Sequence, residues 1–446
     1  MSIFASVDEL FQNSQEFWKA YIPEDSPVLY TGTLLESTAP DKSEESLYSL
    51  TKKFLIKHNK DSKSPEFMVN IEWKLIGPFI AEVEKTTSYG FLIGHATNSK
   101  CFYTNSENEL KVWLGHLSSA GIMTGIKDSF TFAKVIGKGA FSTVYEATCK
   151  NNKKSYAVKV IPKQKIAQDI QPLVREIKIM RKLKHPNIVK LYKVYESISN
   201  IYLVQDYVSG GDLYHRIIEK KRFSENSVKK FTQKMLHVLD YLKTNGVIHR
   251  DIKLENILLK SNDNDYDFKL IDFGLAAELA DHSTTRCGSP GYIAPEMLRQ
   301  EPYGIKVDIF SVGIIIYTLL AGKMPFQGLT PQRVLERNRD CHICFHDEAL
   351  TQISPDGINL VQKLTCSYPG LRISPEKALM HHWFSKMPHK GERHELNSIR
   401  GENELSKELH ASKSAEVMKM SSSRVENLGI NDGKVRSLRI ELKKWI

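Results

Sequence analysis

The sequence has few cysteines and no long apolar run. Six cysteines in 446 residues are too few for a disulfide-stapled secreted domain and indicate a reducing compartment. Cys341 and Cys344 form a lone CxxC without a second pair, so we expect structural thiols there and no metal site. The strongly apolar stretch 312–322 is well short of the roughly 20 residues of a membrane-spanning helix. The N-terminus does not read as a secretion signal, so we expect a cytoplasmic protein and leave peripheral membrane association open.

Positive charge is missing from the first third of the chain. Residues 1–129 carry 12 Lys and no Arg against 17 Asp and Glu, a net charge of −5, and the first arginine is Arg175. Residues 130–384 carry +11 and residues 385–446 carry +4, which gives the whole chain a net charge of +10. No basic stripe is interleaved with aromatic residues, so the positive excess does not indicate nucleic-acid binding.

The region after an N-terminal segment (1–25) is rich in β-branched and aromatic residues separated by polar turns, which predicts strands. The expected strands are 28–36, 50–58, 71–84 and 89–96. A helix is expected over 107–121, with Ser106 as N-cap and Leu110, Trp113, Leu114 and Leu117 at helical spacing. This order resembles a pleckstrin-homology (PH) domain over residues 26–124. The resemblance implies a bent β-sheet or barrel capped by the C-terminal helix.

The charges of this PH-like domain argue against phosphoinositide binding. A lipid head group of several phosphates needs converging Lys and Arg donors. Glu36 stands where lipid-binding members have a basic residue, and the second expected strand offers only Lys52, Lys53 and Lys57. We therefore expect a protein-binding or autoinhibitory role.

Residues 130–384 contain an ordered set of motifs. In chain order they are GKGAFSTV (137–144), SYAVKVI (155–161), REIKIMRKL (175–183), IHRDIKLEN (248–256), LIDFGLA (270–276) and GYIAPE (291–296). In content and order they resemble the protein-kinase signature set. The resemblance implies an α+β, bilobal kinase fold with a small β-rich N-lobe and a large helical C-lobe. ATP and Mg²⁺ are the cofactors that it implies.

Phosphoryl transfer depends mainly on positioning and on neutralising charge that moves between oxygens, so each motif residue has a physical role. The resemblance makes Lys159 the contact to the α and β phosphates, held by Glu176. It makes Asp251 the group that orients the substrate hydroxyl, with Lys253 beside the γ phosphate. Asn256 and Asp272 are oxygen ligands suited to Mg²⁺.

The nucleotide pocket is expected around the glycine loop, where Gly137 and Gly139 permit a tight turn with the backbone close to a phosphate. By the family pattern Gln205 is the gatekeeper before the hinge. The expected ATP-binding residues are Ile136, Gly137, Lys138, Gly139, Ala140, Phe141, Ser142, Thr143, Val144, Ala157, Lys159, Asp206, Val208, Asp212 and Leu258.

Several motifs are most similar to the calcium/calmodulin-dependent kinase group of protein serine/threonine kinases. Thr285 stands where relatives carry an activating phosphate that pairs with an arginine, here Arg250. Asp212 and Glu255 stand where basophilic relatives bind arginine upstream of the phosphoacceptor, so we expect substrates with a basic residue three positions before Ser or Thr.

Two alternatives remain open from the sequence. The first is a catalytically silent pseudokinase scaffold that binds partners through the PH-like domain. The presence of all four residues that such proteins lose, Lys159, Asp251, Asn256 and Asp272, favours the enzyme. The second concerns the polar tail, 385–446, whose end (434–446) is a basic amphipathic pattern with a Trp. Such a helix binds calmodulin, a membrane surface or the folded part of the same chain.

Overall fold

The structure is a computed structural model. It describes residues 17–23, 26–39, 42–83, 86–95, 98–279 and 284–385. Residues up to Phe384 belong to one compact unit. The helix expected over 434–446 lies outside the described residues. Within the described part of the chain, no helix is long and apolar enough to cross a membrane.

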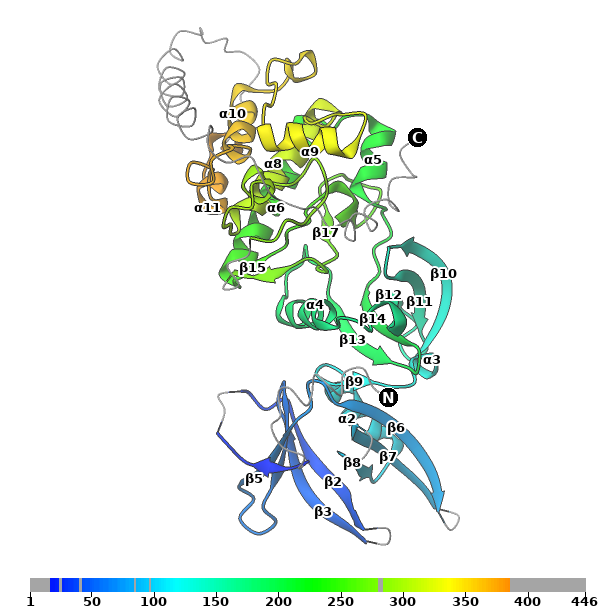
Figure 1. Cartoon of the computed structure of the whole chain (residues 1–446). Coiled ribbons are helices and arrows are strands. Elements are labelled where there is room, and N and C mark those ends of the chain that lie inside the picture. The colour runs from blue at the N-terminus through cyan, green and yellow to red at the C-terminus, as the bar shows by residue number, and fades with distance from the viewer. Residues whose placement is uncertain are drawn as a thin grey trace, which may run out of the picture. The chain divides into compact units, whose positions relative to one another are not determined.

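The N-terminal β domain (residues 17–124) is one bent sheet and one helix (Figure 1). Its elements are β1 (Lys19–Ala20), β2 (Tyr30–Ala39), β3 (Lys42–Leu50), β4 (Phe54–His58), β5 (Pro65–Asn70), β6 (Leu75–Val83), β7 (Thr86–His95), β8 (Asn98–Thr104), α2 (Glu107–Leu117) and β9 (Ile122–Met123). The strand order is β1-β5-β4-β3-β2-β8-β7-β6-β9. The region is β-rich, as expected, but in the described residues no ladder joins β5 to β6, so a closed barrel is not shown.

The strand prediction was incomplete in this domain. Strands β3, β5 and β8 were not expected: β3 and β8 are polar along much of their length, and β5 has a short apolar run of only three residues, Phe67 to Val69. The expected strand 50–58 divides between the end of β3 and β4. Phe17, in the segment before the expected domain, is buried in the domain's core.

The expected helix is confirmed as α2, which ends at Leu117. The side chain of Ser106 accepts a hydrogen bond from the backbone N–H of Glu109 and so satisfies one of the unpaired groups at the helix start. Trp113 is 1% exposed and meets the Tyr30 ring edge-on at 4.8 Å between ring centroids. A large aromatic buried in this way makes Trp113 the helix's main anchor to the sheet.

A buried carboxylate organises one end of this sheet. Glu36 is 1% exposed, and its oxygens accept hydrogen bonds from Lys57 (3.0 Å), Lys100 (2.5 Å), Trp18 (2.9 Å) and Tyr48 (2.9 Å). Burial would raise the pKa of the Glu36 carboxyl, but hydrogen bonds from Lys100, Trp18 and Lys57 outweigh it and lower the pKa from 4.5 to about 2. Two of the domain's lysines are therefore engaged by a carboxylate within the fold.

The small lobe continues the same sheet. Its elements are α3 (Ile126–Ser129), β10 (Phe130–Lys138), β11 (Thr143–Cys149), β12 (Ser155–Pro162), the 3₁₀ turn η1 (Lys163–Lys165), α4 (Gln171–Lys182), β13 (Leu191–Glu196) and β14 (Asn200–Asp206). Strand β9 pairs in parallel with β6 on one side and with β13 on the other. The two-residue strand thus links the ladder of the N-terminal β domain to that of the small lobe.

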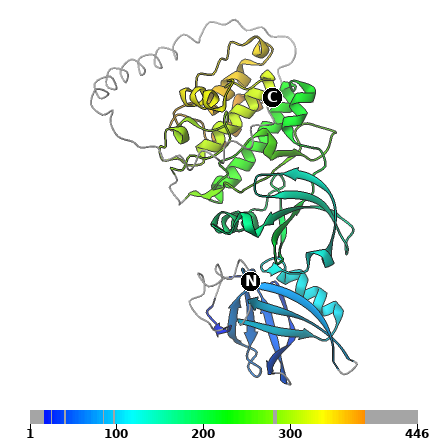
Figure 2. The ribbon, with the colours of Figure 1, turned by 45° about the vertical axis from the view of Figure 1, so that its right-hand side comes forward.

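The large lobe is mainly helical. Its elements are α5 (Leu213–Lys220), α6 (Glu225–Thr244), β15 (Val247–Ile248), η2 (Leu254–Asn256), β16 (Ile257–Leu259), β17 (Phe268–Leu270), β18 (Ala277–Glu278), α7 (Pro295–Leu298), α8 (Lys306–Ala321), α9 (Pro331–Asp340), η4 (Glu348–Leu350), α10 (Pro355–Leu364), α11 (Pro375–Leu379) and η5 (His382–Phe384). Every residue of α8 after Lys306 is buried, so the apolar run noted in the sequence is a core helix. It packs against α6 and α10, and Figure 2 gives a second view of these helices.

Replacement of Glu36 is expected to destabilise the N-terminal β domain in a pH-dependent way. The folded pKa lies below the unfolded value, so the stabilisation is present above pH 4.5 and lost as pH falls through about 2. Glu36→Gln should cost about 3 kcal/mol at neutral pH, and the difference should shrink by about 1 kcal/mol at pH 4. Urea titration of the full chain, read by hydrogen exchange in peptides covering 30–58, measures this.

The matched control is Glu44→Gln, because Glu44 also contacts Lys57 but at 3.5 Å and with its side chain 45% exposed. An exposed pair of this kind contributes less than about 1 kcal/mol. The stabilising role of the buried Glu36 carboxylate would be contradicted if both substitutions lowered the free energy of unfolding equally. It would also be contradicted if the loss in Glu36→Gln did not change with pH.

Candidate active site

The glycine loop joins β10 to β11. The N–H of Gly139 donates to the Ser142 carbonyl at 2.9 Å, and Lys165 Nζ donates to the Ala140 carbonyl at 2.8 Å. Neither Gly137 nor Gly139 has a φ in the left-handed region, so the turn does not require glycine in the way the sequence suggested. The absence of side chains instead leaves the loop backbone uncovered, as close approach to a phosphate requires.

The remaining loop residues and the expected adenine contacts lie on β10, β11, β12 and β16 and in the turn between β10 and β11. Ile136 and Phe141 are 40% and 62% exposed, whereas Ala157 is 8% exposed. Lys138 and Thr143 pair across β10 and β11. The half-buried Val144 and Leu258 belong to β11 and β16, so they come from different lobes.

Lys159 is held between two carboxylates. Its Nζ lies 2.6 Å from Glu176 Oε1, on α4, and 3.3 Å from Asp272 Oδ1, which follows β17. Burial would lower the pKa of Lys159, but the charges of Glu176 and Asp272 outweigh burial and raise it. The Lys159 ammonium in turn lowers the pKa of the Asp272 carboxyl. The site therefore places one ammonium group between two carboxyl groups.

Asp251 is the centre of a second cluster. Ser289 Oγ donates to Asp251 Oδ1 at 2.8 Å, and Lys253 Nζ donates to Ser289 Oγ at 2.8 Å. Lys253 Nζ also lies 3.1 Å from Asp251 Oδ2, and Asn256 Nδ2 donates to that oxygen at 3.1 Å. Both carboxylate oxygens of Asp251 are thus oriented. The hydrogen bonds of Asn256 use its nitrogen, which leaves its Oδ1 as the atom suited to a cation.

The backbone under Asp251 is fixed from the core. Asp308, at the start of α8, is 0% exposed and accepts the N–H groups of His249 (2.7 Å) and Arg250 (2.9 Å). Burial raises the pKa of the Asp308 carboxyl. Arg250 and Asp272 have φ values of 67° and 62°. Non-glycine residues at positive φ persist where the surroundings hold them, and such strain is common at functional sites.

The side chains of two expected nucleotide-binding residues, Asp206 at the hinge and Asp212 after it, are engaged in protein contacts. Asp206 accepts hydrogen bonds from Tyr192 Oη (2.8 Å) and the Lys190 N–H (2.9 Å), so only its backbone is available to a nucleotide base. Asp212 caps α5 by accepting the N–H of His215 at 2.8 Å. Val208 is half-buried between these two positions.

The activation segment and the catalytic loop meet at one tyrosine. Tyr303 Oη donates to the Thr285 carbonyl at 2.8 Å, and an Arg250 guanidinium nitrogen lies 3.3 Å from the same Oη. Arg250 also donates to the Leu275 carbonyl at 2.6 Å. Thr285 and Arg250, which were expected to pair, therefore both contact Tyr303, Thr285 through its backbone carbonyl and Arg250 through its side chain.

One carboxylate oxygen of Glu255, Oε2, is buried and accepts no hydrogen bond from the described residues. Burial raises the pKa of the Glu255 carboxyl, and the nearby charges of Asp251 and Asp212 act in the same direction. An acidic group in this state favours the approach of a cationic ligand.

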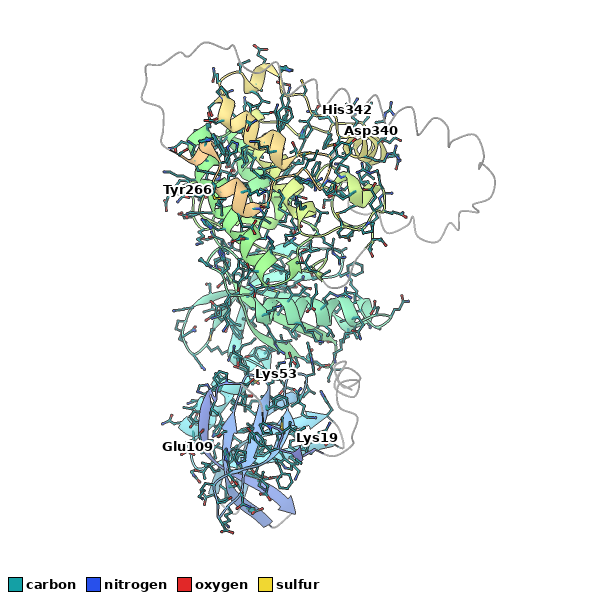
Figure 3. All side chains as sticks on the ribbon, turned by 90° about the vertical axis from the view of Figure 1, so that its left-hand side faces the viewer. Lys19, Lys53, Glu109, Tyr266, Asp340 and His342 are labelled. Atoms are coloured by element: carbon teal, nitrogen blue, oxygen red, sulfur yellow. The ribbon has the colours of Figure 1, made fainter. Side chains whose placement is uncertain are left out.

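The CxxC pair is not part of a metal cluster in the described residues. Cys341 is the C-cap of α9 and is half-buried, while Cys344 is exposed. Figure 3 labels Asp340, the last residue of α9, and His342.

Ser289, Tyr303 and Asp308 were not recognised in the sequence as site residues. Ser289 lies two residues before the GYIAPE motif (291–296), so its place beside a motif was visible but its contact with Asp251 was not. Tyr303 and Asp308 lie outside the motifs used, and only the folded chain brings them to the site.

Comparison with known proteins defines the class. A family profile described as "Protein kinase domain" matches residues 130–384. "Probable serine/threonine-protein kinase 2" of Plasmodium falciparum is 34% identical over 310 residues, 69% of this chain and 58% of that protein. "Calcium/calmodulin-dependent protein kinase type 1" of Caenorhabditis briggsae is 37% identical over 264 residues, 59% of this chain and 74% of that protein. "Myosin light chain kinase A" of Dictyostelium discoideum is 35% identical over 264 residues, 58% of this chain and 90% of that protein.

The match covers more than half of the chain, and the chain belongs to the protein kinase family. It spans 58% of the length of the Plasmodium relative. Within the large lobe the buried Arg372 donates to both oxygens of the buried Glu296 at 2.6 and 2.9 Å.

Ser289→Ala should lower kcat by about 10- to 100-fold, because a hydrogen bond to a charged group contributes about 1.5–3 kcal/mol. The KM for ATP should change little, since Ser289 contacts Asp251 and Lys253 and not the glycine loop. Ser289→Thr keeps the hydroxyl and should restore most of the rate. Steady-state kinetics with a Ser peptide measures kcat and the KM for ATP of both variants. An unchanged kcat in Ser289→Ala would contradict the role of Ser289 in orienting Asp251.

Proposed function

We propose that this chain is an active protein serine/threonine kinase that transfers the γ-phosphoryl group of ATP to Ser or Thr hydroxyls of proteins. The observation that carries the proposal is the pair of charged clusters around Lys159 and Asp251, both assembled from the motif residues. In this assignment Lys159 binds the α and β phosphates while Glu176 holds it. Asp251 orients the substrate hydroxyl and receives its proton, and Lys253 stabilises the charge of the transferring group.

The nucleotide lies between the glycine loop and the β16 strand in this proposal. The loop residues 137–144 cover the phosphates, and the apolar side chains of Ile136, Ala157 and Leu258 contact the base. The backbone from Asp206 to Val208 hydrogen-bonds to adenine, since the carboxylate of Asp206 is already engaged. Asp212 reaches the ribose in this proposal with Oδ2, the oxygen that does not cap α5, and there it shares that oxygen with His215 Nδ1, which lies 2.8 Å away.

Mg²⁺ fits the donor set as a nucleotide-bound ion. Asn256 and Asp272 supply a carboxamide and a carboxylate oxygen, which are the hard ligands that Mg²⁺ prefers. The described residues hold no group of three or more His, Cys, Asp or Glu suited to a metal, so the phosphates would complete the coordination. Bound there, the ion neutralises charge on the phosphates.

Ser/Thr specificity rests on Lys253 and on the relatives. Lys253 is two residues after Asp251, where Ser/Thr kinases have a lysine, and it contacts both Asp251 and Ser289. The relatives described above are named as a probable serine/threonine kinase, a calcium/calmodulin-dependent kinase and a myosin light chain kinase. The scaffold alternative is disfavoured because the charged clusters are complete.

Substrates with a basic residue three positions before Ser or Thr fit the acidic group at the site. The buried, unpartnered Oε2 of Glu255 would gain a donor from an arginine of the substrate. Asp212, the second acidic residue expected there, contributes less because it caps α5.

Phosphorylation of Thr285 is proposed as the activating event. A phosphate on Thr285 would pair with Arg250, which already shares Tyr303 with the Thr285 backbone. Such a pair would hold the activation segment against the catalytic loop.

Regulation beyond the kinase lobes stays a prediction from the sequence. The basic segment 434–446 is proposed to bind calmodulin or to dock on the folded chain, and calmodulin-dependent relatives support the first. The N-terminal β domain is proposed to bind proteins, because Glu36 already pairs with Lys57 and Lys100. All six cysteines are free thiols, which supports the proposed cytoplasmic location.

The function is tested by transfer of labelled phosphate from ATP and Mg²⁺ to a Ser peptide by the full chain. Asp251→Asn should lower kcat by at least about 100-fold, because it removes the group that receives the proton. ATP binding, measured separately by calorimetry, should stay within twofold, since Asp251 does not contact the nucleotide in the proposed arrangement.

Asp263→Asn, an exposed aspartate outside the clusters, is the control and should keep full activity. The same assay tests the regulatory part, since Thr285→Ala should lower activity after incubation with ATP while Thr284→Ala should not. If the full chain transfers no phosphate to the peptide, even when Thr285 is phosphorylated, the result would favour the pseudokinase scaffold over the active kinase.

The substrate preference is tested with two peptides that differ only in Arg or Ala three positions before the Ser. The full chain should favour the Arg peptide by about 10-fold or more in kcat/KM, as expected for a charge-assisted hydrogen bond. Glu255→Gln should reduce that preference to less than about threefold. Glu219→Gln, on the exposed side of α5, should leave it unchanged. Preference for the Ala peptide would overturn the proposed substrate class.

A further inference from the structure

Arg181 joins the helix that carries Glu176 to the N-terminal β domain. It lies in the last turn of α4, and its two terminal nitrogens donate to the carbonyls of Glu72 and Gly121, each at 2.9 Å. The guanidinium also lies over the Trp73 ring, 5.4 Å from its centroid. A planar guanidinium can donate to two carbonyls and stack on a ring at the same time. The ammonium group of a lysine cannot do both.

The two carbonyls are held in place by the sheet. The N–H of Ile122, next to Gly121, donates to the Lys74 carbonyl at 3.0 Å, and β9 continues into ladders with both β6 and β13. A Cβ on Gly121 would overlap the Ile76 side chain, so the chain passes close to β6 at this point. The acceptors of Arg181 therefore belong to a fixed part of the fold.

Apolar residues next to the Arg181 contact also pack against α4. Trp73 is 3% exposed and Ile122 is fully buried, and both belong to the buried cluster that includes Val174 and Ile177 of α4. The following residue of α4 is anchored to the large lobe, since Lys182 Nζ donates to the Asn245 carbonyl at 2.6 Å. The C-terminal end of α4 is thus held from two sides.

We propose that Arg181 is a positioning residue for phosphoryl transfer: it holds the end of α4 against the N-terminal β domain and so keeps Glu176 in contact with Lys159. This inference rests on the proposed kinase function. It gives the N-terminal β domain a direct part in catalysis, whatever else that domain binds.

The chemistry of Lys159 explains why the position of α4 matters. Lys159 Nζ is 2.6 Å from Glu176 and 3.3 Å from Asp272. If α4 shifts and Glu176 withdraws, Asp272 becomes the remaining partner of the ammonium. Asp272 is then drawn away from Mg²⁺, and Lys159 away from the phosphates. Loss of Arg181 would therefore act through Glu176 and lower kcat more than it raises the KM for ATP.

The test is Arg181→Met in the full chain, which keeps an apolar stem and removes the donors. We expect kcat to fall about 10-fold with the KM for ATP within about twofold, and Arg181→Lys to recover only part of the rate. Arg175→Met is the matched control, because Arg175 is an exposed arginine on the same helix, and it should leave kcat unchanged.

A double-mutant cycle separates positioning from general destabilisation. In a Glu176→Gln background, Arg181→Met should lower kcat by less than about twofold, because the group through which it acts is already altered. Independent effects that multiply, or an Arg181→Met kcat equal to that of Arg175→Met, would overturn the proposal.

Hydrogen exchange gives a readout that does not depend on activity. Peptides covering 171–182 should exchange at least about fivefold faster in Arg181→Met, while peptides covering 306–321 in the core helix stay unchanged. If the unaltered chain transfers no phosphate, the proposed kinase function is wrong. The hydrogen-exchange rates of 171–182 then still test whether Arg181 anchors α4. Unchanged exchange over 171–182 would refute that hold in either case.

Discussion

A lysine ammonium enclosed between two carboxylates is the interaction on which the rest of the site depends. Taking a charge out of water is costly unless it is paired and hydrogen-bonded, so Lys159, Glu176 and Asp272 stabilise one another only when all three are in place. They come from β12, α4 and the loop after β17. The small lobe, its helix and the large lobe must therefore be correctly assembled before Lys159 can contact both carboxylates, which couples the chemistry to the arrangement of the lobes.

The same constraint appears wherever this chain buries a charge. Asp308 is balanced by backbone donors of the catalytic loop, and Glu296 by both guanidinium nitrogens of Arg372. Glu36 gathers two lysines at the end of a bent sheet. In each case removal of one partner leaves an unpaired group in a dry environment, which costs more than the pair itself contributes. Buried charges thus fix which segments meet, while apolar packing supplies most of the stability.

The sequence could predict what is encoded locally and not what depends on distant contacts. Lys159, Asp251 and Asp272 lie in motifs whose spacing is informative, and the Ser106 cap and the helix after it follow from the next few residues. Polar strands such as Lys42–Leu50 give no clear alternation, so their pairing with β2 was missed. Ser289 lies next to a recognised motif, but its hydrogen bond to Asp251 joins residues 38 positions apart. No local pattern reports such a contact.

The start of the family match at Phe130 is a boundary in the sequence but not in the buried core. Phe130, Val158 and Tyr195 of the small lobe belong to the same buried cluster as Trp113 and Met123 of the N-terminal β domain. Without β9, strand β13 would have an unpaired edge of N–H and C=O groups, which is unfavourable in solution and invites association. The small lobe of this kinase therefore extends physically into the domain before it, and the two should be treated as one folding unit.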